Sequence, residues 1–477
     1  MTKADIVIIG GGITGTMIAR ALSKYDLRTV LVEKENDIAD GATMANSAIV
    51  HTGYDPEDGT LKALLNVRGA RLYDSILDEM NCRYLTTGAF IAACGEEEEK
   101  HLQVLRDRAD RRGIPYRILS GDEARREEPN LSGEVTGVID FHTTKVIYPW
   151  EVALKAAKVA VNNGVTVLLG HEVTGIDHED GQYTVHAGDE LIECKAVINA
   201  AGIMADRIVA FVEEPKFTMR PRRGEYYVLD KDVHLVDHII FPVPSEEKGK
   251  GVLAVPTVYG NTLIGPNSDF IDDREDNGTS YYGLDYVRKN MAKTLNNVPF
   301  NRSIRTFAGI RPASTSSDFI IEESDTCPGF INVASIESPG LASSPAIAEY
   351  VIENFISKRF ELIEKEDADM TLPKDTVLSD MSEEERNVLI KERPEYGRIV
   401  CRCEQISEGE ILDALKGPLG ATTVKGVKKR CRPGMGRCQG GFCEPLVMEI
   451  LSRELNKNPL DIELDGKGSY ILERSNR

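Results

Sequence analysis

The sequence lacks several features that mark membrane-spanning, exported and nucleic-acid-binding proteins. No run of about 18 apolar residues occurs, which argues against a membrane-spanning helix. The N-terminus has neither the charged segment nor the small-residue cleavage site of a signal peptide. The formal net charge of −20 leaves no basic excess for binding nucleic acid. We therefore expect a cytoplasmic protein without a membrane span of its own.

The sequence also lacks the even number of cysteines that is typical of a disulfide framework. Nine cysteines occur, and an odd number without an export signal makes a disulfide framework improbable. Five of them crowd near the C-terminus, at Cys401, Cys403, Cys431, Cys438 and Cys443. This crowding indicates a metal or cluster site. The length of 477 residues predicts two to four structural units, because a single core rarely grows past about 250–300 residues.

A nucleotide-binding pattern begins the chain. Residues 5–10 form an apolar β-branched run typical of a buried parallel strand, and the spacing of Gly10, Gly12 and Gly15 is G-x-G-x-x-G. Residues 16–25 are expected to form a helix, and a second strand over 29–32 ends at Glu33. The glycines permit close approach to a pyrophosphate, and the carboxylate suits the ribose of FAD or NAD rather than NADP.

Further pieces of the same domain are expected later in the chain. Residues 165–169, 196–202 and 329–336 are predicted strands, and the second ends in small residues that suit a pyrophosphate. The small and polar segment 40–54 suits close contact with an isoalloxazine ring, and a turn at 338–344 leads into a helix expected from Pro345. Besides the three glycines and Glu33, the expected cofactor-binding residues are Lys34, Thr43, Ser47, Val173, Ala201, Gly202, Gly340, Leu341 and Ala342.

Four segments carry a resemblance to a known family: Ala45–Asp55, Arg223–Tyr226, Ala308–Pro312 and Ser338–Leu341. They are similar to the D-amino-acid-oxidase superfamily, and within it to the FAD-dependent glycerol-3-phosphate dehydrogenase family of the anaerobic, catalytic-subunit type. The resemblance implies an α/β fold in which an antiparallel-sheet substrate domain is inserted into a Rossmann-like FAD-binding domain. The expected division is FAD-binding pieces at about 1–74, 151–214 and 326–360, and a substrate domain at about 75–150 and 215–325.

Flavin chemistry on an alcohol needs a base for the hydroxyl proton. His51 is the preferred base because it lies in the segment expected at the flavin, although its imidazole could instead serve only the backbone. The resemblance directs Arg311 at the anionic group of the substrate, which the planar guanidinium suits. Tyr54 and Arg223 are weaker catalytic candidates, since both residue types often serve packing or ion pairs.

The C-terminal region follows an acidic linker at 361–394, which is expected to be solvated and to hold one helix capped by Ser382. In the domain at 395–477, Cys401, Cys403, Cys438 and Cys443 form a C-x-C…C-x4-C set that suits an iron–sulfur cluster, although zinc also accepts four thiolates. The segment resembles the bacterioferritin-associated-ferredoxin-like (BFD-like) domain, a small helical domain that holds a [2Fe–2S] cluster. Cys431 departs from the pattern and is interpreted as a non-ligand.

Six basic residues surround Cys431: Lys425, Lys428, Lys429, Arg430, Arg432 and Arg437. This run is predicted either to offset the negative charge of the cluster, to bind an acidic electron-transfer partner, or to form a solvated basic turn.

The leading functional hypothesis is an FAD- and [2Fe–2S]-dependent glycerol-3-phosphate dehydrogenase that passes electrons toward a quinone. The alternatives are a dehydrogenase of a 2-hydroxy acid, such as 2-hydroxyglutarate, or of an amino acid, and a non-catalytic electron-transfer module. The resemblance implies a second flavoprotein and an iron–sulfur or membrane-linked subunit as partners. Through them the chain is expected to lie at the inner face of the membrane.

Overall fold

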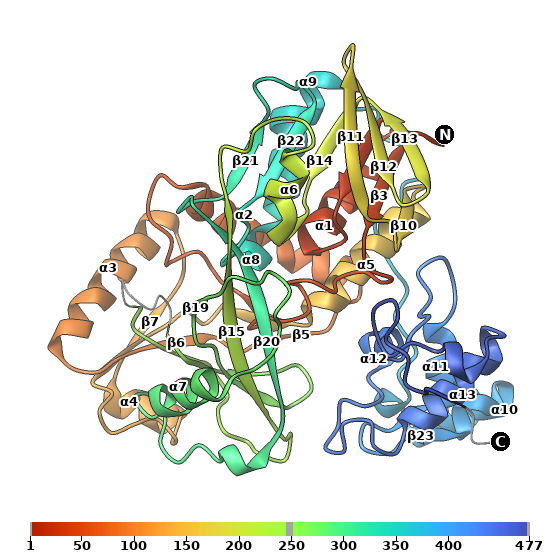
Figure 1. The fold of residues 1–477 in the computed structure, drawn as a ribbon. Helices are drawn as coiled ribbons and strands as arrows, with labels where there is room; N and C mark the ends of the chain where they lie inside the picture. Colours follow the sequence, from red (N-terminus) through yellow and green to blue (C-terminus); the bar gives the residue numbers. More distant parts are fainter. Residues whose placement is uncertain (1, 245–250, 475–477) are drawn as a thin grey trace.

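The computed structural model describes residues 2–244 and 251–474. Its central element is a six-stranded sheet in the order β10-β3-β2-β14-β22-β21, in which all neighbours are parallel except β21 (Figure 1). β2, β14 and β22 are buried along their whole length, which explains their apolar β-branched sequences. The strands are β2 (Ile6–Ile9), β3 (Thr29–Glu33), β10 (Thr166–Leu169), β14 (Ala196–Asn199), β21 (Ile320–Glu323) and β22 (Phe330–Ala334).

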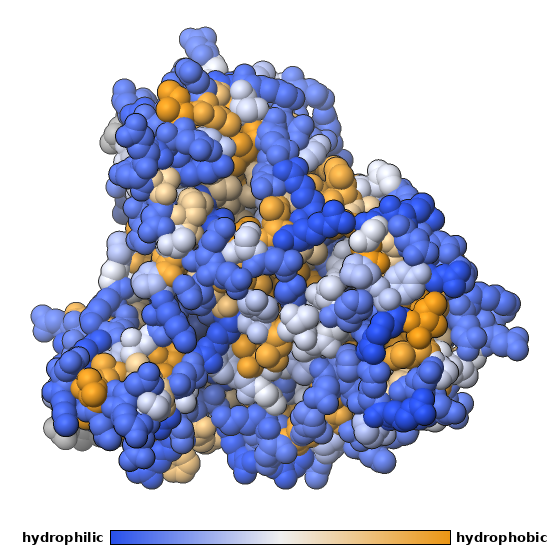
Figure 2. Space-filling view, turned by 180° about the vertical axis from the view of Figure 1, so that it is seen from behind, coloured by the Kyte–Doolittle hydropathy of each residue, from blue (hydrophilic) through white to orange (hydrophobic). Residues whose placement is uncertain are grey.

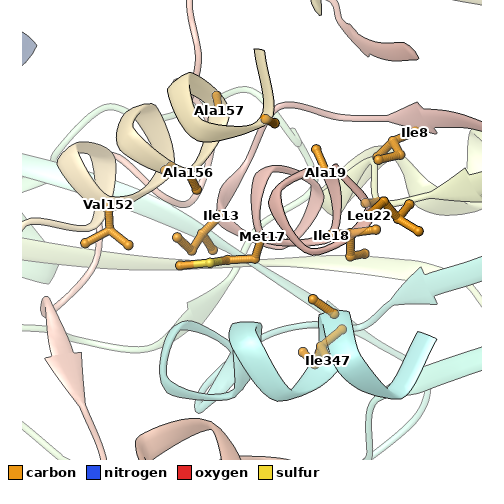
Figure 3. Packing of buried hydrophobic residues seen from close by; sticks show 14 of the residues in the cluster. Ile8, Ile13, Met17, Ile18, Ala19, Leu22, Val152, Ala156, Ala157 and Ile347 are labelled. Carbon is orange, nitrogen blue, oxygen red and sulfur yellow. The ribbon is translucent and has the colours of Figure 1, made fainter. Parts of the chain in front are cut away.

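Both faces of this sheet are covered. On one face lie α1 (Ile13–Leu22), α2 (Leu61–Glu79), α5 (Pro149–Asn162) and α8 (Gly340–Val351), and Met17 of α1 packs between α5 and α8 (Figure 3). On the other lie α6 (Ala205–Val209) and a sheet of β1 (Thr2–Lys3), β11 (Val173–Glu179), β12 (Gln182–Ala187) and β13 (Glu190–Cys194). α1 begins three residues before the predicted Thr16, because Gly12 caps it directly after the glycine turn.

A second, larger sheet draws its strands from 75–150 and 215–325, the two segments expected to form the substrate domain. Its order is β19-β15-β18-β17-β16-β6-β8-β7, and β20 pairs with β15. All neighbours are antiparallel except β16 and β6. The strands are β6 (Ala89–Ala93), β7 (Arg117–Ser120), β8 (Gly137–Asp140), β15 (Met219–Leu229), β16 (Ile239–Pro242), β17 (Leu253–Pro256), β18 (Thr262–Gly265), β19 (Asp269–Phe270) and β20 (Ser303–Ser314).

Helices pack on the two faces of the second sheet. The longer two are α3 (Glu96–Arg112) and α7 (Tyr281–Met291). The short helix α4 (Gly121–Glu127) follows β7. A small sheet of β4 (Ile49–Val50), β9 (Lys145–Ile147) and β5 (Tyr84–Thr86) joins the two larger regions. We refer to residues 2–360 as the flavin body.

The acidic linker is less solvated than its composition predicts. Glu364 forms a β-bridge with Tyr25, and the buried Leu372 donates its backbone N–H to the Glu79 carbonyl over 2.9 Å. Its first half therefore lies along the flavin body, where the few apolar residues among the charges find a surface to pack on. The predicted helix is α10 (Glu383–Glu392), and Ser382 caps it together with Glu385.

The last part of the chain, residues 395–474, forms a small unit that we call the cysteine module. It contains β23 (Ile399–Cys401), β24 (Ile406–Ser407), α11 (Glu408–Ala414), α12 (Val424–Cys431) and α13 (Glu444–Glu454) around a core of its own. The module lies beside the flavin body near α5 (Figure 1). One prediction for the basic run is a solvated turn. In the structure the run begins within α12, where Val424 and Val427 are buried.

One face of the molecule is mostly polar, with separate small apolar patches (Figure 2). Of the helices in residues 2–244 and 251–474, none is both long and apolar enough to span a bilayer.

Candidate active site and cysteine cluster

A cavity of about 1460 Å³ runs between the two large sheets and reaches the cysteine module. Its walls come from the glycine turn, the segment 40–49, strands β15 and β20, the start of α8, and α12 with the loop that follows it. This volume exceeds that of ordinary ligand pockets, and its length suits an extended dinucleotide with room for a small substrate.

The glycine turn stands at one end of the cavity. Gly10 has a φ of +109°, and a Cβ there would lie 2.4 Å from the Ala200 carbonyl oxygen, so only glycine fits. A Cβ on Gly15 would lie 2.0 Å from the Gly10 oxygen, which explains why Gly15 packs in the turn rather than lining the cavity. Gly12 caps α1, whose N-terminus opens into the cavity as a pyrophosphate site requires.

Glu33 ends β3 beside this turn and accepts hydrogen bonds from the backbone N–H of Gly11 (2.5 Å) and of Glu35 (2.9 Å). Burial raises the pKa of its carboxyl group, and these two hydrogen bonds oppose the rise. Of the other predicted cofactor residues, eight line the same cavity: Lys34, Thr43, Ser47, Val173, Ala201, Gly202, Gly340 and Leu341.

Ala342 is the predicted cofactor residue that the structure places in the core, at full burial against α2. α8 begins at Gly340 rather than at the predicted Pro345, which lies inside the helix. A proline there cannot donate to the Leu341 carbonyl. The hydroxyl groups of Tyr73 and Ser344 donate to that carbonyl instead, each over 2.9 Å, so the helix extends past the proline and brings Gly340 to the cavity.

The segment expected at the flavin crosses the second sheet at one point of close approach. A Cβ on Gly309 of β20 would lie 1.9 Å from the Ala45 oxygen, so glycine is required for this crossing. The Ser47 and Tyr226 hydroxyl groups are 3.0 Å apart and fix the segment to β15. His51 follows at the cavity wall, 8% exposed, with its ring centroid 5.7 Å from that of Phe241. The cavity therefore contains an imidazole beside the expected flavin position.

Two arginines meet at the same wall. Arg311 of β20 is the register partner of Arg222 on β15, and both side chains line the cavity. Burial and the neighbouring Arg311 lower the pKa of Arg222. Glu337 and Asp269 partly oppose this lowering of the pKa. Glu337 pairs with Lys62 instead, and within the described residues no carboxylate lies within salt-bridge distance of either guanidinium. Two adjacent cations outside any salt bridge at a cavity wall suit an anion. Arg311 was predicted from the sequence to bind the anionic group of the substrate, whereas Arg222 was not predicted.

The other two catalytic candidates lie outside the cavity lining. Tyr54 is 2% exposed and stacks on Phe141 with ring centroids 4.0 Å apart. Arg223 points to the opposite face of β15 from Arg222, because side chains alternate along a strand, and it pairs with Asp276 over 2.6 Å. This alternation is a signal that could have grouped Arg222 with Tyr226, which also lines the cavity.

The four predicted cluster ligands come together in the cysteine module as two pairs. The Sγ atoms of Cys403 and Cys438 are 3.7 Å apart, and the thiols of Cys401 and Cys443 share a hydrogen bond. In the described part of the chain, no three His, Cys, Asp or Glu side chains converge as they would on a single metal ion. Two pairs of thiols suit a binuclear cluster, in which each iron takes two thiolates.

The thiols of Cys401 and Cys443 form one coupled pair. Their shared hydrogen bond, with backbone N–H groups of Gly434 and Glu404, lowers the pKa of Cys401, and the same hydrogen bond raises the pKa of Cys443. Gly436 is required for the loop to close, since a Cβ there would lie 2.3 Å from the Cys403 Cβ. The Cys431 thiol donates to the Val427 carbonyl within α12 over 3.5 Å, and burial raises its pKa.

The fold and the cavity define a flavin-dependent oxidoreductase with an appended cysteine cluster. The family model "FAD dependent oxidoreductase" (DAO) matches residues 5–354, and the model "BFD-like [2Fe-2S] binding domain" matches residues 399–453. The chain belongs to the DAO family of FAD-dependent oxidoreductases and carries a BFD-like [2Fe–2S] domain. FAD and a [2Fe–2S] cluster are its cofactors, as the sequence analysis expected.

Three similar proteins show the range of the family. A glycerol 3-phosphate dehydrogenase of Caloramator mitchellensis is 43% identical over 98% of both chains. An L-2-hydroxyglutarate dehydrogenase of Escherichia coli is 32% identical over 57% of this chain and 65% of its own. The solved structure of the L-alpha-glycerophosphate oxidase of Mycoplasma pneumoniae with FAD bound has a TM-score of 0.74 and 29% identity, covering 78% of this chain and all of that one.

Proposed function

We propose that the protein oxidises sn-glycerol 3-phosphate to dihydroxyacetone phosphate and passes the electrons out through its [2Fe–2S] cluster. The observation that carries the proposal is the Arg222–Arg311 pair, two cations that take part in no salt bridge of the described chain and line the same cavity as His51. The dehydrogenase that is 43% identical over nearly the whole chain supports the choice of substrate. We also propose the domain division expected from the sequence: FAD-binding pieces at about 1–74, 151–214 and 326–360, and a substrate domain at about 75–150 and 215–325.

In this mechanism the two arginines bind the phosphate and thereby hold the secondary alcohol at His51. FAD, held by the glycine turn, Glu33 and the segment 40–49, would supply the two-electron oxidant, with N5 as the acceptor of the substrate hydride. The imidazole of His51 accepts the hydroxyl proton, so that the alcohol loses one hydride and one proton and leaves as a ketone. Ser47 and Tyr226 keep the segment that carries His51 in place against β15.

The cysteine module supports a route for the electrons. Cys443 lines the same cavity as the glycine turn and the arginines, so one cavity joins the expected flavin position to a cluster ligand. A one-electron cluster suits transfer to a protein acceptor rather than to oxygen. We propose a second flavoprotein and an iron–sulfur or membrane-linked subunit as acceptors, with a quinone as the final carrier and the chain peripheral to the membrane through them.

A second candidate keeps the same site and takes a 2-hydroxy acid. The similar L-2-hydroxyglutarate dehydrogenase favours it, since two arginines also suit a dicarboxylate. The match to that relative, however, covers only 57% of this chain.

Stopped-flow bleaching of the flavin by a substrate panel separates the two candidates. The holoenzyme is mixed anaerobically with sn-glycerol 3-phosphate, its enantiomer, L-2-hydroxyglutarate and a neutral glycerol control. We expect fast bleaching with sn-glycerol 3-phosphate alone. Bleaching by the hydroxy acid, without bleaching by the phosphate ester, would overturn the proposal.

A further inference from the structure

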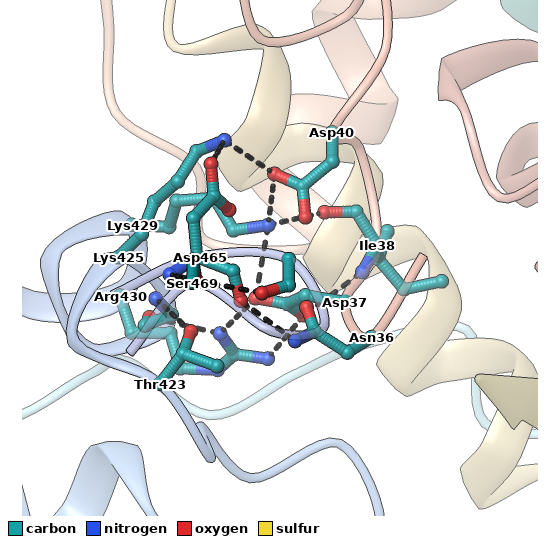
Figure 4. Close-up of polar contacts among 12 residues, drawn as sticks. Asn36, Asp37, Ile38, Asp40, Thr423, Lys425, Lys429, Arg430, Asp465 and Ser469 are labelled. Carbon is teal, nitrogen blue, oxygen red and sulfur yellow. Dashed lines mark hydrogen bonds and ion pairs between the residues drawn. The ribbon is translucent and has the colours of Figure 1, made fainter. Parts of the chain in front are cut away.

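The helix α12 of the cysteine module presents three residues of the basic run to acidic residues of the flavin body (Figure 4). Lys425, Lys429 and Arg430 contact the short loop Asp37–Asp40, which follows β3. Arg437, farther along, pairs with Asp230 and Asp232 at the second sheet. The run therefore acts mainly as an interface between the module and the flavin body.

Lys429 is the centre of this contact, and its side chain is fully buried. Its ammonium group lies 2.9 Å from an Asp37 oxygen, 3.0 Å from an Asp40 oxygen, and 2.7 Å from the Ile38 carbonyl oxygen. All three of its N–H donors are thus used on one loop. Arg430 adds a bidentate pair with Asp37, with both N···O distances at 2.8 Å.

The loop that these cations hold is part of the FAD site. Ala39 has a φ of +70°, an unusual conformation for a non-glycine residue, and donates its N–H to the Gly11 carbonyl of the glycine turn over 3.0 Å. Asp40 lines the cavity and begins the segment that carries Thr43 and Ser47. Gly11 on one side and Lys429 on the other therefore fix where this segment enters the cavity.

Electrostatic repulsion is a second reason why docking of the cysteine module would affect FAD binding. Asp37 and Asp40 are both almost fully buried, and buried carboxylates without cations are strongly unfavourable. Asp40 also lines the cavity, as does the glycine turn where the pyrophosphate of FAD is expected, so unpaired negative charge there would oppose the binding of an anionic dinucleotide. The module cations remove that repulsion.

We propose that Lys429 and Arg430 of the cysteine module are FAD-positioning residues: by neutralising and holding Asp37 and Asp40, they fix the loop that leads into the FAD-contacting segment. FAD binding and docking of the module then stabilise each other, because coupling between two binding events is reciprocal. The inference rests on the FAD cofactor and is independent of which substrate is oxidised.

The test measures FAD affinity of full-length protein whose FAD has been removed while the cluster is retained. Lys429→Met is compared with Lys429→Arg and with Lys416→Met, a control whose side chain is 65% exposed and pairs with Asp413 inside the module. We expect Lys429→Met to weaken FAD binding about 10-fold, within the usual range of coupling. Lys429→Arg is expected to restore most of the affinity, and Lys416→Met to match the unmodified protein, with equal cluster absorbance in all.

Because the coupling is reciprocal, bound FAD should also hold the cysteine module more firmly in place, and this gives a second readout. FAD is expected to protect the linker at 361–377 from a protease in the unmodified protein, and to protect it less in Lys429→Met. If Lys429→Met binds FAD as tightly as Lys416→Met with its cluster intact, the proposal is overturned. If Lys429→Met does not fold, Arg430→Met carries the same test, with an expected weakening of about 3-fold because Asp37 loses one of its two cations, and unchanged affinity would contradict the proposal.

Discussion

Cations serve opposite purposes in the flavin cavity and on the cysteine module. In the cavity, Arg222 and Arg311 are register partners, and neither takes part in a salt bridge of the described chain. On the module, Lys429 and Arg430 are enclosed by the carboxylates of Asp37 and Asp40. Unpaired buried cations mark a place for an external anion, whereas paired ones hold two parts of the molecule together. Composition alone does not separate these two roles.

The largest expected effect comes from removing the base while both sets of cations remain. His51→Asn should lower the rate of flavin reduction by about 10²–10⁴-fold, the usual contribution of general base catalysis, with FAD still bound. Anaerobic stopped-flow absorbance measures the rate. Reduction at the unmodified rate would remove His51 from the mechanism.

The next largest effect is expected from replacing Arg222 or Arg311, the two cations at the cavity wall. Arg222→Met and Arg311→Met should each raise the KM for the anionic substrate by about 10–100-fold, because a hydrogen bond to a charged group contributes about 1.5–3 kcal/mol. Arg220→Met is the matched control, since Arg220 lies on the same strand but is exposed and does not line the cavity. An equal rise of KM in all three variants would contradict a specific anion site.

The module contact has a predicted pH dependence. Burial alone would raise the pKa of Asp37, but the ion pairs with Arg430 and Lys429 outweigh it and lower the pKa from 3.8 to about 2. The resulting stabilisation, on the order of 2 kcal/mol, is present above about pH 4 and is lost as the pH falls from 3.8 toward 2. The Tm difference between unmodified protein and Asp37→Asn should therefore shrink from pH 6 to pH 3. A constant difference would count against the pair.

The smallest expected effect concerns Lys428, the one member of the basic run that lines the cavity without an ion pair in the described chain. Burial lowers its pKa to about 8, so at pH 7 it is mostly charged, and Cys443 and Glu444 lie near enough to favour that charge. Lys428→Met should lower the midpoint potential of the cluster by less than about 59 mV, a factor of ten for one electron. A redox titration followed by EPR measures the shift, with Lys416→Met as control.

Local patterns in the sequence predicted the two cofactors, FAD and a [2Fe–2S] cluster, which the family models confirm. The glycine turn, Glu33 and the four paired cysteines depend on short-range spacing, which the chain displays directly. Arg222 was missed and Arg223 preferred, because the face of β15 that meets the cavity depends on its register with β20, some 80 residues later. The contact of Lys429 with Asp37 joins positions 392 residues apart, and no local pattern indicates such a pair.

The central claim is that one cavity joins substrate oxidation at the flavin to the cysteine cluster. A single anaerobic turnover with sn-glycerol 3-phosphate tests it, with flavin absorbance and cluster EPR followed on the same sample. We predict that the flavin is reduced first and that the EPR signal of the reduced cluster then rises as flavin electrons are withdrawn. A reduced flavin beside a cluster that stays oxidised, or no flavin reduction at all, would contradict the account.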